Sequence, residues 1–361
     1  TMKSVVLPSA LPVIFAGLPE IFESEGYDRT SMKLPKCQDR LIEEVLKVQP
    51  NVVVVLHNGS PVELPWADRV SAILEMYLGG QGVGEACDRL LFGEANPSGR
   101  LAETFPYRLE DNPSFLHFPG NGKRVLYGED IFVGYRYYDT KKVPVRYAFG
   151  HGLSYTEFTY GDLTLSSAQM TDEDILTVSL KVKNSGKTEG KEVVQLYVAD
   201  LCGISERPVK ELKGFAKVHL LPGEEKTVSM EISARNLSYY EERLGDWYAP
   251  SGTYRILIGH ASDDIRLHAD VVFETKKKLP LRVDFTTTFG ELLDHTKTAP
   301  VITELLAPLA AAAASAEGMS DEYKKLGEQV IREMPLKSLL GQMPGEQVEQ
   351  LIGQLNCLLA Q

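Results

Sequence analysis

Cysteine is scarce in this 361-residue sequence, and its four copies lie far apart along the chain. Cys37, Cys87, Cys202 and Cys357 form neither a CxxC pair nor the close spacing of a disulfide framework. We therefore expect reduced thiols. Both a cysteine-based zinc site and a small disulfide-stapled fold are excluded.

Positive charge is also in short supply, because 38 Lys and Arg face 50 Asp and Glu, for a net charge of −12 and a pI near 5.2. This balance disfavours binding to phosphate backbones and to anionic lipid. Long apolar runs are missing as well: the stretch from Ser4 to Gly17 is interrupted by Pro8 and Pro12 and has no cleavage site. We expect no nucleic-acid partner, no membrane partner and a cytoplasmic location, with secretion left open.

Motifs for metals and nucleotides are absent from the sequence too. His57, His117 and His151 do not fall at HExxH or another metal-binding spacing, so structural roles are expected for them. The glycines from Gly79 to Gly84 lack both the GK[ST] ending and the full GxGxxG spacing. No cofactor is therefore predicted.

The residues that are present, 43% hydrophobic and 24% charged, suffice for two or three globular cores. Near-continuous β-branched runs alternate with helical periodicity over residues 1–106, which is typical of a mostly parallel sheet with helices on its faces. The predicted elements there are strands Val13–Ala16, Val52–Leu56 and Ala72–Tyr77 and helices Lys36–Lys47 and Gly84–Leu91.

Further along the chain the pattern changes twice. Residues 107–157 are irregular and rich in aromatic side chains, which indicates a packed connector. Residues 158–275 alternate polar and apolar side chains between turn signals, which predicts an antiparallel β-sandwich. Residues 276–361 are predicted to form a linker and a helical tail, with a flexible joint from Ala310 to Asp321. The predicted fold is thus multidomain: a partial α/β sandwich, a β-sandwich and a tail.

The segment after the first predicted strand is crowded with carboxylates: Glu20, Glu23, Glu25 and Asp28 share it with a single cation, Arg29. Loops at the carboxyl ends of parallel strands are where ligands meet open α/β sheets. Repulsion between carboxylates can keep one of them protonated for use as a general acid. By spacing alone, a solvated acidic loop with one salt bridge to Arg29 is the favoured explanation, because carboxylate clusters on loops are common.

A family resemblance adds to this interpretation. The run from Glu23 to Pro35, ESEGYDRTSMKLP, resembles the acid/base loop of the β-glucosidases of glycoside hydrolase family 3. Further similar motifs follow in the same order, ending with a segment that resembles the family's fibronectin type III-like domain. They are NVVVVLHNGSPVELPW from Asn51, YLGGQ from Tyr77, LFG from Leu91, NPSGRL from Asn96, YGEDIFVGYRYY from Tyr127, FGHGLSY from Phe149, RPVKELKGF from Arg207 and LPGE from Leu221.

This resemblance implies a retaining glycosidase that releases terminal non-reducing β-D-glucosyl residues from a β-glucoside or β-linked oligosaccharide. The residue at the acid/base position is Glu25, with Glu23 as the second choice, and Asp28 and Arg29 are candidates for a supporting ion pair. The resemblance also implies that the nucleophile is an aspartate in a Ser-Asp-Trp or similar motif on a separate (β/α) barrel. The present sequence contains neither this motif nor the pattern of a barrel. We therefore expect the chain to need such a barrel as a partner and to be inactive alone.

Two other functions remain open at this stage. One is a non-catalytic carbohydrate-binding or assembly module, and the other is a β-xylosidase or arabinosidase of the same family. Trp66 could stack on a sugar, but packing between elements is the more common role of such a residue.

Overall fold

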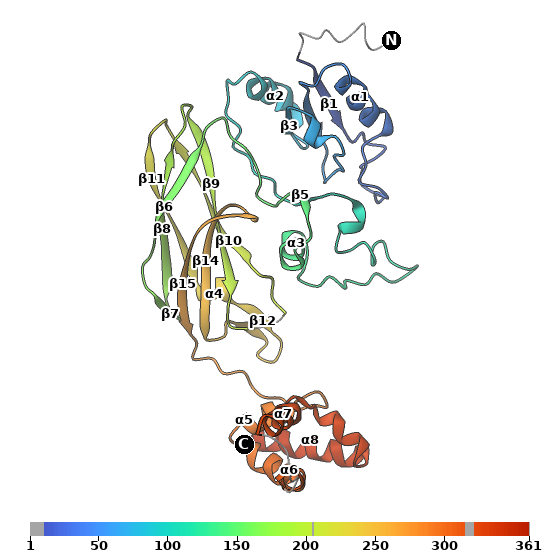
Figure 1. Cartoon of the computed structure of the whole chain (residues 1–361), viewed down its shortest axis with the longest axis vertical. Coiled ribbons are helices and arrows are strands. Elements are labelled where there is room, and N and C mark those ends of the chain that lie inside the picture. The colour runs from blue at the N-terminus through green and yellow to red at the C-terminus, as the bar shows by residue number, and fades with distance from the viewer. Residues whose placement is uncertain (1–10, 204–205, 315–320, 361) are drawn as a thin grey trace. The chain divides into compact units, whose positions relative to one another are not determined.

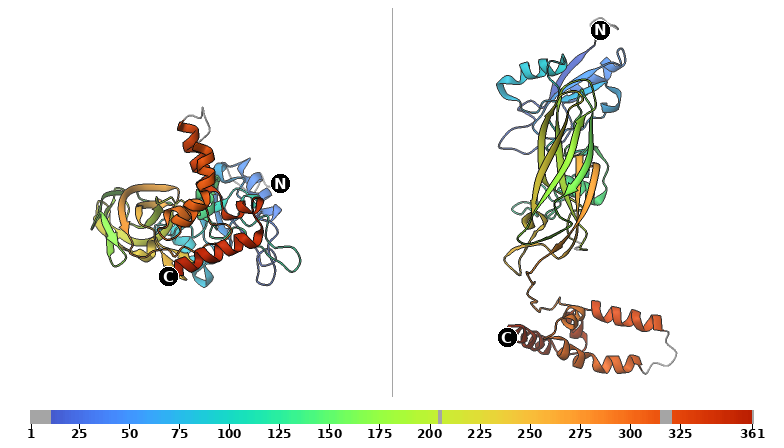
Figure 2. Two further views of the ribbon diagram at one scale, coloured as in Figure 1. Left: turned by 90° about the horizontal axis from the view of Figure 1, so that it is seen from below. Right: turned by 90° about the vertical axis from the view of Figure 1, so that its left-hand side faces the viewer.

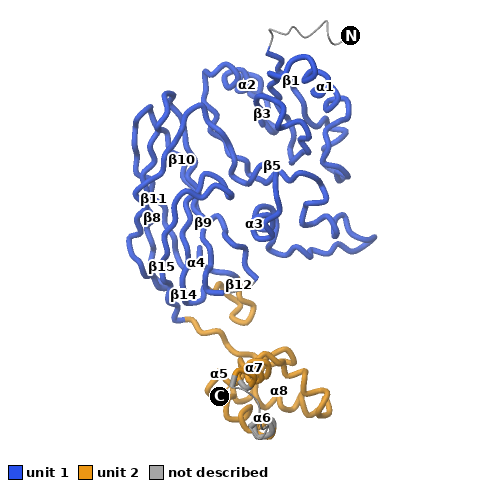
Figure 3. The backbone as a smooth tube through the Cα atoms, in the orientation of Figure 1, with its two compact units in different colours: residues 1–239, 249–276 blue, residues 240–248, 277–361 orange. Residues whose placement is uncertain are grey.

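The computed structural model describes residues 11–203, 206–314 and 321–360. The chain forms two compact units, one of residues 1–239 and 249–276 and one of residues 240–248 and 277–361 (Figure 3). The first unit contains the α/β region, the connector and the sandwich (Figure 1).

The α/β region is built on a three-stranded parallel sheet in the order β1-β2-β3. The valine-rich run makes β2 the central strand, and Val54 and Val55 are fully buried. Such β-branched side chains fit a pleated surface covered by other elements. The elements are β1 (Val13–Gly17), α1 (Lys36–Leu46), β2 (Val53–His57), η2 (Ala67–Arg69), β3 (Ala72–Glu75), η3 (Gly80–Gly82) and α2 (Val83–Leu91).

The two faces of this sheet are not covered to the same extent by other elements. Ile42 and Val45 of α1 are buried in the same cluster as Ile14 and Val54. Phe15 points away from that cluster and is 60% exposed, because successive side chains of a strand alternate between faces. The parallel sheet with its helices therefore agrees with the predicted partial α/β sandwich.

The connector runs from the α/β region to the sandwich with little regular structure. Its elements are β4 (Phe105–Pro106), η4 (Leu109–Asp111), α3 (Tyr135–Lys141) and β5 (Val145–Tyr147). Several of its aromatic rings pack on one another, among them Tyr135, which stacks on Phe149 with ring centroids 4.7 Å apart and meets Tyr197 of the sandwich edge to face.

The sandwich consists of a five-stranded sheet, β10-β9-β14-β15-β7, and a three-stranded sheet, β11-β8-β6. Its long strands run side by side (Figure 2), and all neighbours pair antiparallel except β15 and β7. The strands are β6 (Phe158–Leu165), β7 (Gln169–Thr171), β8 (Ile175–Asn184), β9 (Gly190–Asp200), β10 (Glu211–Leu220), β11 (Glu225–Ser233), β14 (Gly252–Ala261) and β15 (Asp264–Glu274).

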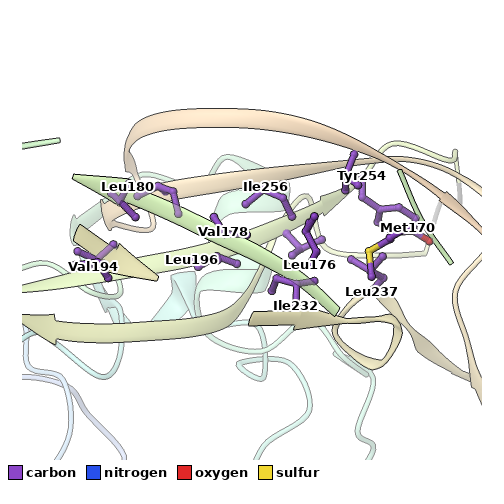
Figure 4. Packing of buried hydrophobic residues seen from close by; sticks show 14 of the residues in the cluster. Met170, Leu176, Val178, Leu180, Val194, Leu196, Ile232, Leu237, Tyr254 and Ile256 are labelled. Carbon is purple, nitrogen blue, oxygen red and sulfur yellow. The ribbon is translucent and has the colours of Figure 1, made fainter. Parts of the chain in front are cut away.

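Alternation along these strands fills the space between the two sheets. Leu176, Val178 and Leu180 of β8 face Leu196 of β9 and Ile256 of β14, and all five are buried (Figure 4). This is the period-two pattern from which the sandwich was predicted. A short helix, α4 (Ala234–Leu237), follows β11. The strands β12 (Tyr239–Glu241) and β13 (Asp246–Tyr248) pair with each other, and residues 240–248 belong to the second unit.

The tail forms its own helical core around Leu292, Ile302, Leu336 and Leu355. Its elements are α5 (Phe289–Asp294), α6 (Ala299–Ala314), α7 (Asp321–Glu333), η5 (Leu336–Gly341) and α8 (Gly345–Ala360). The predicted joint was wrong at its start, since 310–314 continue α6, as the high helix propensity of alanine favours. Residues 315–320 of that joint lie outside the described residues. None of the helices described is both long and apolar enough to cross a membrane.

Candidate functional site

The carboxyl ends of β1, β2 and β3 lie at one edge of the parallel sheet, so the loops that follow them are neighbours. The backbone of Gly17 pairs with that of His57, and Leu18 N donates to His57 O at 2.9 Å. An added Cβ atom at Gly17 would lie 1.9 Å from His57 O. Glycine is therefore required where the acidic loop leaves the sheet.

Within this loop, Glu23 makes the contacts to the neighbouring loop. Its Oε2 accepts a hydrogen bond from Gly59 N at 2.6 Å, and its Oε1 accepts one from the Ser60 hydroxyl. Arg29 Nη1 lies 3.5 Å from Glu23 Oε1 and also donates to Ser60 Oγ at 2.5 Å and to Pro61 O at 3.4 Å. The Glu23 and Arg29 side chains are only 20% and 18% exposed, so the pair is partly shielded from solvent.

The other acidic residues of the loop point outward. Glu20, Glu25 and Asp28 are all exposed. In the part of the chain that the structure describes, the ion pair of Arg29 is with Glu23 rather than with Asp28. Gly26, next to Glu25, has a φ of 94°, a left-handed conformation that favours glycine. Glu25 thus stands at a sharp turn with its carboxyl group accessible to a ligand.

A second group of carboxylates, not anticipated from the sequence, lies behind the loop. Burial raises the pKa of Glu75, at the end of β3, to about 7, and the charges of Glu103 and Glu23 add to the rise. Burial also raises the pKa of Glu103, against the lowering effect of a hydrogen bond from Tyr77. Burial and both of these carboxylates raise the pKa of the Tyr77 phenol. The edge of the sheet is therefore an acidic environment with Arg29 as its counter-charge.

Tyr77 also explains why β3 is shorter than predicted. The strand was expected to continue to Tyr77 but ends at Glu75. Tyr77 has a φ of 47°, and its backbone N donates to Glu75 Oε1 at 2.8 Å. This turn breaks the ladder. A charged residue directly after the apolar Ala72–Leu74 was the available sequence signal for Glu75.

A cavity of about 360 Å³ opens beside Arg29 and the connector. Its lining includes Arg29, Ser60, Glu103 and Thr104, whereas Glu25 is not among the lining residues. Burial lowers the pKa of Arg29, although Glu23 and Glu103 oppose that shift. The cavity therefore adjoins the Arg29 guanidinium rather than the exposed Glu25 carboxylate.

Trp66 lies away from any ligand-accessible surface. It is fully buried in the α/β core, and its Nε1 donates to Asp39 Oδ1 at 2.9 Å. Packing, the more common of the two roles considered for Trp66, is the one that the structure supports.

Comparison with known families gives two matches. The Glycosyl hydrolase family 3 C-terminal domain matches residues 4–155, and the Fibronectin type III-like domain matches residues 192–262. The first match spans the acidic loop and the connector, and the second falls within the β-sandwich. Both agree with the resemblance inferred from the sequence motifs.

Among curated proteins, Thermostable beta-glucosidase B of Acetivibrio thermocellus is 47% identical over 358 residues, which cover 98% of this chain and 47% of that protein. The Beta-glucosidase of Kluyveromyces marxianus is also 47% identical, over 70% of this chain and 30% of the relative. The chain thus spans at most about half the length of these relatives.

Solved structures agree with the sequence matches. A family 3 β-glucosidase of Bifidobacterium adolescentis superposes with a TM-score of 0.75 at 39% identity, covering 81% of this chain and 43% of that one. β-Glucosidase 3B of Thermotoga neapolitana, in complex with α-D-glucose, gives a TM-score of 0.66 at 38% identity, covering 72% and 37%. These similarities extend through both the α/β region and the sandwich.

Proposed function

Because this chain belongs to glycoside hydrolase family 3, we propose that it supplies the general acid/base to a retaining β-glucosidase active site. The family's barrel domain would supply the nucleophile, since a retaining mechanism needs two carboxyl groups roughly 5–5.5 Å apart. Residues 1–361 by themselves are then expected to show no turnover.

Glu25 is the proposed acid/base, and its exposure is the observation that carries the proposal. A group that protonates a glycosidic oxygen must reach the substrate, and Glu25 is exposed at the loop turn. Glu23 fits this role less well, because both of its carboxylate oxygens already accept hydrogen bonds from Gly59 and Ser60. Arg29, through its contacts with Glu23, Ser60 and Pro61, would then support the loop rather than react, and the exposed Asp28 is given no part in that support.

The reaction would proceed in two steps. Glu25 first protonates the leaving oxygen while the barrel's carboxylate attacks the anomeric carbon, and a covalent glycosyl intermediate forms. Glu25, now ionised, then takes a proton from water, which attacks the intermediate and releases the sugar with its β configuration retained. No cofactor takes part in either step.

A terminal β-D-glucosyl residue is the proposed substrate group. The similar curated proteins are named β-glucosidases, and solved relatives from Kluyveromyces marxianus and Thermotoga neapolitana are complexes with glucose. These names favour glucose over the xylose and arabinose alternatives. They also favour an enzyme over a non-catalytic binding module.

The test is hydrolysis of p-nitrophenyl-β-D-glucoside by the polypeptide that joins this chain to its family 3 barrel. Glu25→Ala is expected to lower kcat about 10²- to 10⁴-fold, the usual contribution of a positioned acid/base. Azide should restore turnover and yield β-glucosyl azide, because it needs no general base to attack the intermediate. Glu20→Ala, an exposed neighbour, serves as the control. Near-normal turnover of Glu25→Ala would refute the assignment.

A further inference from the structure

The loop that carries Glu25 has few attachments of its own to the α/β core. Phe22 N donates to Pro19 O at 2.7 Å, and the Tyr27 hydroxyl donates to Glu20 O, so these bonds close the loop on itself. Among the described residues, the Glu25 side chain has no hydrogen-bond or ion-pair partner. What fixes this carboxyl group in space must therefore act through its neighbours in the loop.

Glu23 provides the connection to the next loop. Its two oxygens accept hydrogen bonds from the backbone of Gly59 and the hydroxyl of Ser60, both of which lie in the loop after β2. A Cβ atom at Gly59 would lie 3.2 Å from Glu23 Oε2 and from Leu78 Cδ1, so the carboxylate approaches the backbone closely. The bonds involve a charged acceptor, which makes them stronger than hydrogen bonds between neutral groups.

Arg29 closes the same connection from the far side of Glu25. Its guanidinium contacts Glu23 Oε1, Ser60 Oγ and Pro61 O, so residues on both sides of Glu25 converge on one point of the β2 loop. The fully buried Asn58 donates a hydrogen bond from Nδ2 to Ser60 O at 3.1 Å and so fixes the backbone of Ser60. Two residues of extended chain span at most about 7 Å, so an anchored Glu23 restricts where Glu25 can lie.

We propose that Glu23 is a positioning residue, which ties the acid/base loop to Gly59 and Ser60 and thereby places the Glu25 carboxyl group for catalysis. This inference rests on the proposed function of Glu25. It gives Glu23 a role distinct from catalysis, since the carboxylate bound in the loop contact never reaches the substrate. Arg29 completes the anchor by neutralising Glu23 beside Glu103 and Glu75.

Hydrogen exchange on the 361-residue chain tests the anchor without any activity. Glu23→Ala should speed exchange of the Gly59 amide and of amides 22–29 by roughly tenfold or more, because a hydrogen bond to a charged acceptor is lost. Ser60→Ala should produce a smaller increase in the same segment. Glu25→Ala and Glu20→Ala, which remove exposed carboxylates from the same loop, should leave the exchange unchanged. Unchanged exchange in Glu23→Ala would overturn the anchor.

Kinetics of the barrel-containing polypeptide then separate positioning from catalysis. Glu23→Ala should lower kcat about tenfold or more with no rescue by azide and with a bell-shaped pH profile retained, since the acid/base is still present. Glu23→Gln keeps one acceptor oxygen and should recover part of the loss.

The outcomes distinguish failure of the inference from failure of the proposed function. Normal kcat in Glu23→Ala, with azide rescue of Glu25→Ala, would overturn the positioning role and leave the acid/base assignment standing. Azide rescue of Glu23→Ala, with normal turnover in Glu25→Ala, would show that Glu23 is itself the acid/base and overturn both.

Discussion

Glu192 of β9 gives the sharpest stability prediction, because it joins the sandwich to the α/β region through a buried ion pair. Arg100 Nη2 donates to Glu192 Oε1 at 2.7 Å, and the two side chains are 6% and 0% exposed. Val193 N donates to the same oxygen at 2.6 Å, and His260 Nδ1 lies 3.3 Å from Oε2. Replacement of Glu192 would leave the Arg100 guanidinium buried without its counter-charge.

We expect Glu192→Ala to destabilise the first unit by about 3–5 kcal/mol, the usual cost of removing one partner of a buried pair. At roughly 2–4 °C per kcal/mol for chains of 150–250 residues, the midpoint of thermal unfolding should fall by about 6–20 °C. The measurement is scanning calorimetry or circular dichroism of the 361-residue chain at neutral pH. The double variant with Arg100→Ala should cost less than the sum of the single changes.

A matched control lies in the same sandwich. Arg255 and Asp270 form a cross-strand pair between β14 and β15, with side chains 39% and 42% exposed. Exposed pairs contribute about 0–1 kcal/mol, so Asp270→Ala should shift the midpoint by a few degrees at most. If Glu192→Ala and Asp270→Ala lowered the midpoint of thermal unfolding by the same small amount, the reasoning from burial would be refuted.

The pH dependence offers a second check on Glu192. Burial is the largest single influence and by itself raises the pKa of Glu192, but His260 and Arg100 outweigh it and hold the pKa below its ordinary value. A carboxyl with a lowered folded-state pKa stabilises above its unfolded pKa of about 4.3, and the contribution disappears as the pH falls through the folded pKa. The stability gap between wild type and Glu192→Ala should therefore narrow below about pH 4.

Two further predictions concern the α/β region. Glu75 has a folded-state pKa of about 7, above its unfolded value, so its ionisation opposes folding as the pH rises from about 4.3 to 7. In urea unfolding, the stability of Glu75→Gln relative to wild type should therefore increase between pH 5 and pH 8. A difference in unfolding free energy that does not change with pH would contradict this. Trp66→Ala should lower the free energy of unfolding by about 3–5 kcal/mol, because it empties a fully buried position and removes the hydrogen-bond donor to Asp39. Calorimetry of the chain measures this change. A loss below about 1 kcal/mol would show that Trp66 is not part of the core.

Much of the fold could be predicted because its signals are local. The valine run from Val52 gives β2, and the apolar spacing around Ile42 gives α1, with ends that match to within one or two residues. The alternation in Leu176–Lys183 likewise gives β8, since one face of a half-buried strand must be apolar. The domain boundaries at residues 106, 157 and 275 stay predictions.

The local signals failed where the surroundings decide the backbone or the charge. Tyr77 looked like the end of a strand, but its turn is made with the partly buried Glu75 carboxylate. The parallel pairing of β7 with β15 joins Gln169 to Val272, more than a hundred residues along the chain, and no short-range pattern encodes it. The raised pKa of Glu75 depends on burial that its sequence neighbours do not specify.

The sequence by itself determined the family, the parallel α/β region followed by a β-sandwich, and Glu25 with Glu23 as candidate acids, because ordered motifs and periodicity are properties of the chain. The resemblance placed Glu25 ahead of Glu23, but only the tertiary structure showed that the two side chains have different environments. Glu23 is bonded to Gly59 and Ser60 across two loops, while Glu25 stands exposed. The physical reason is that hydrogen bonding and exposure depend on which loops the sheet brings together, and residues two positions apart can have opposite environments.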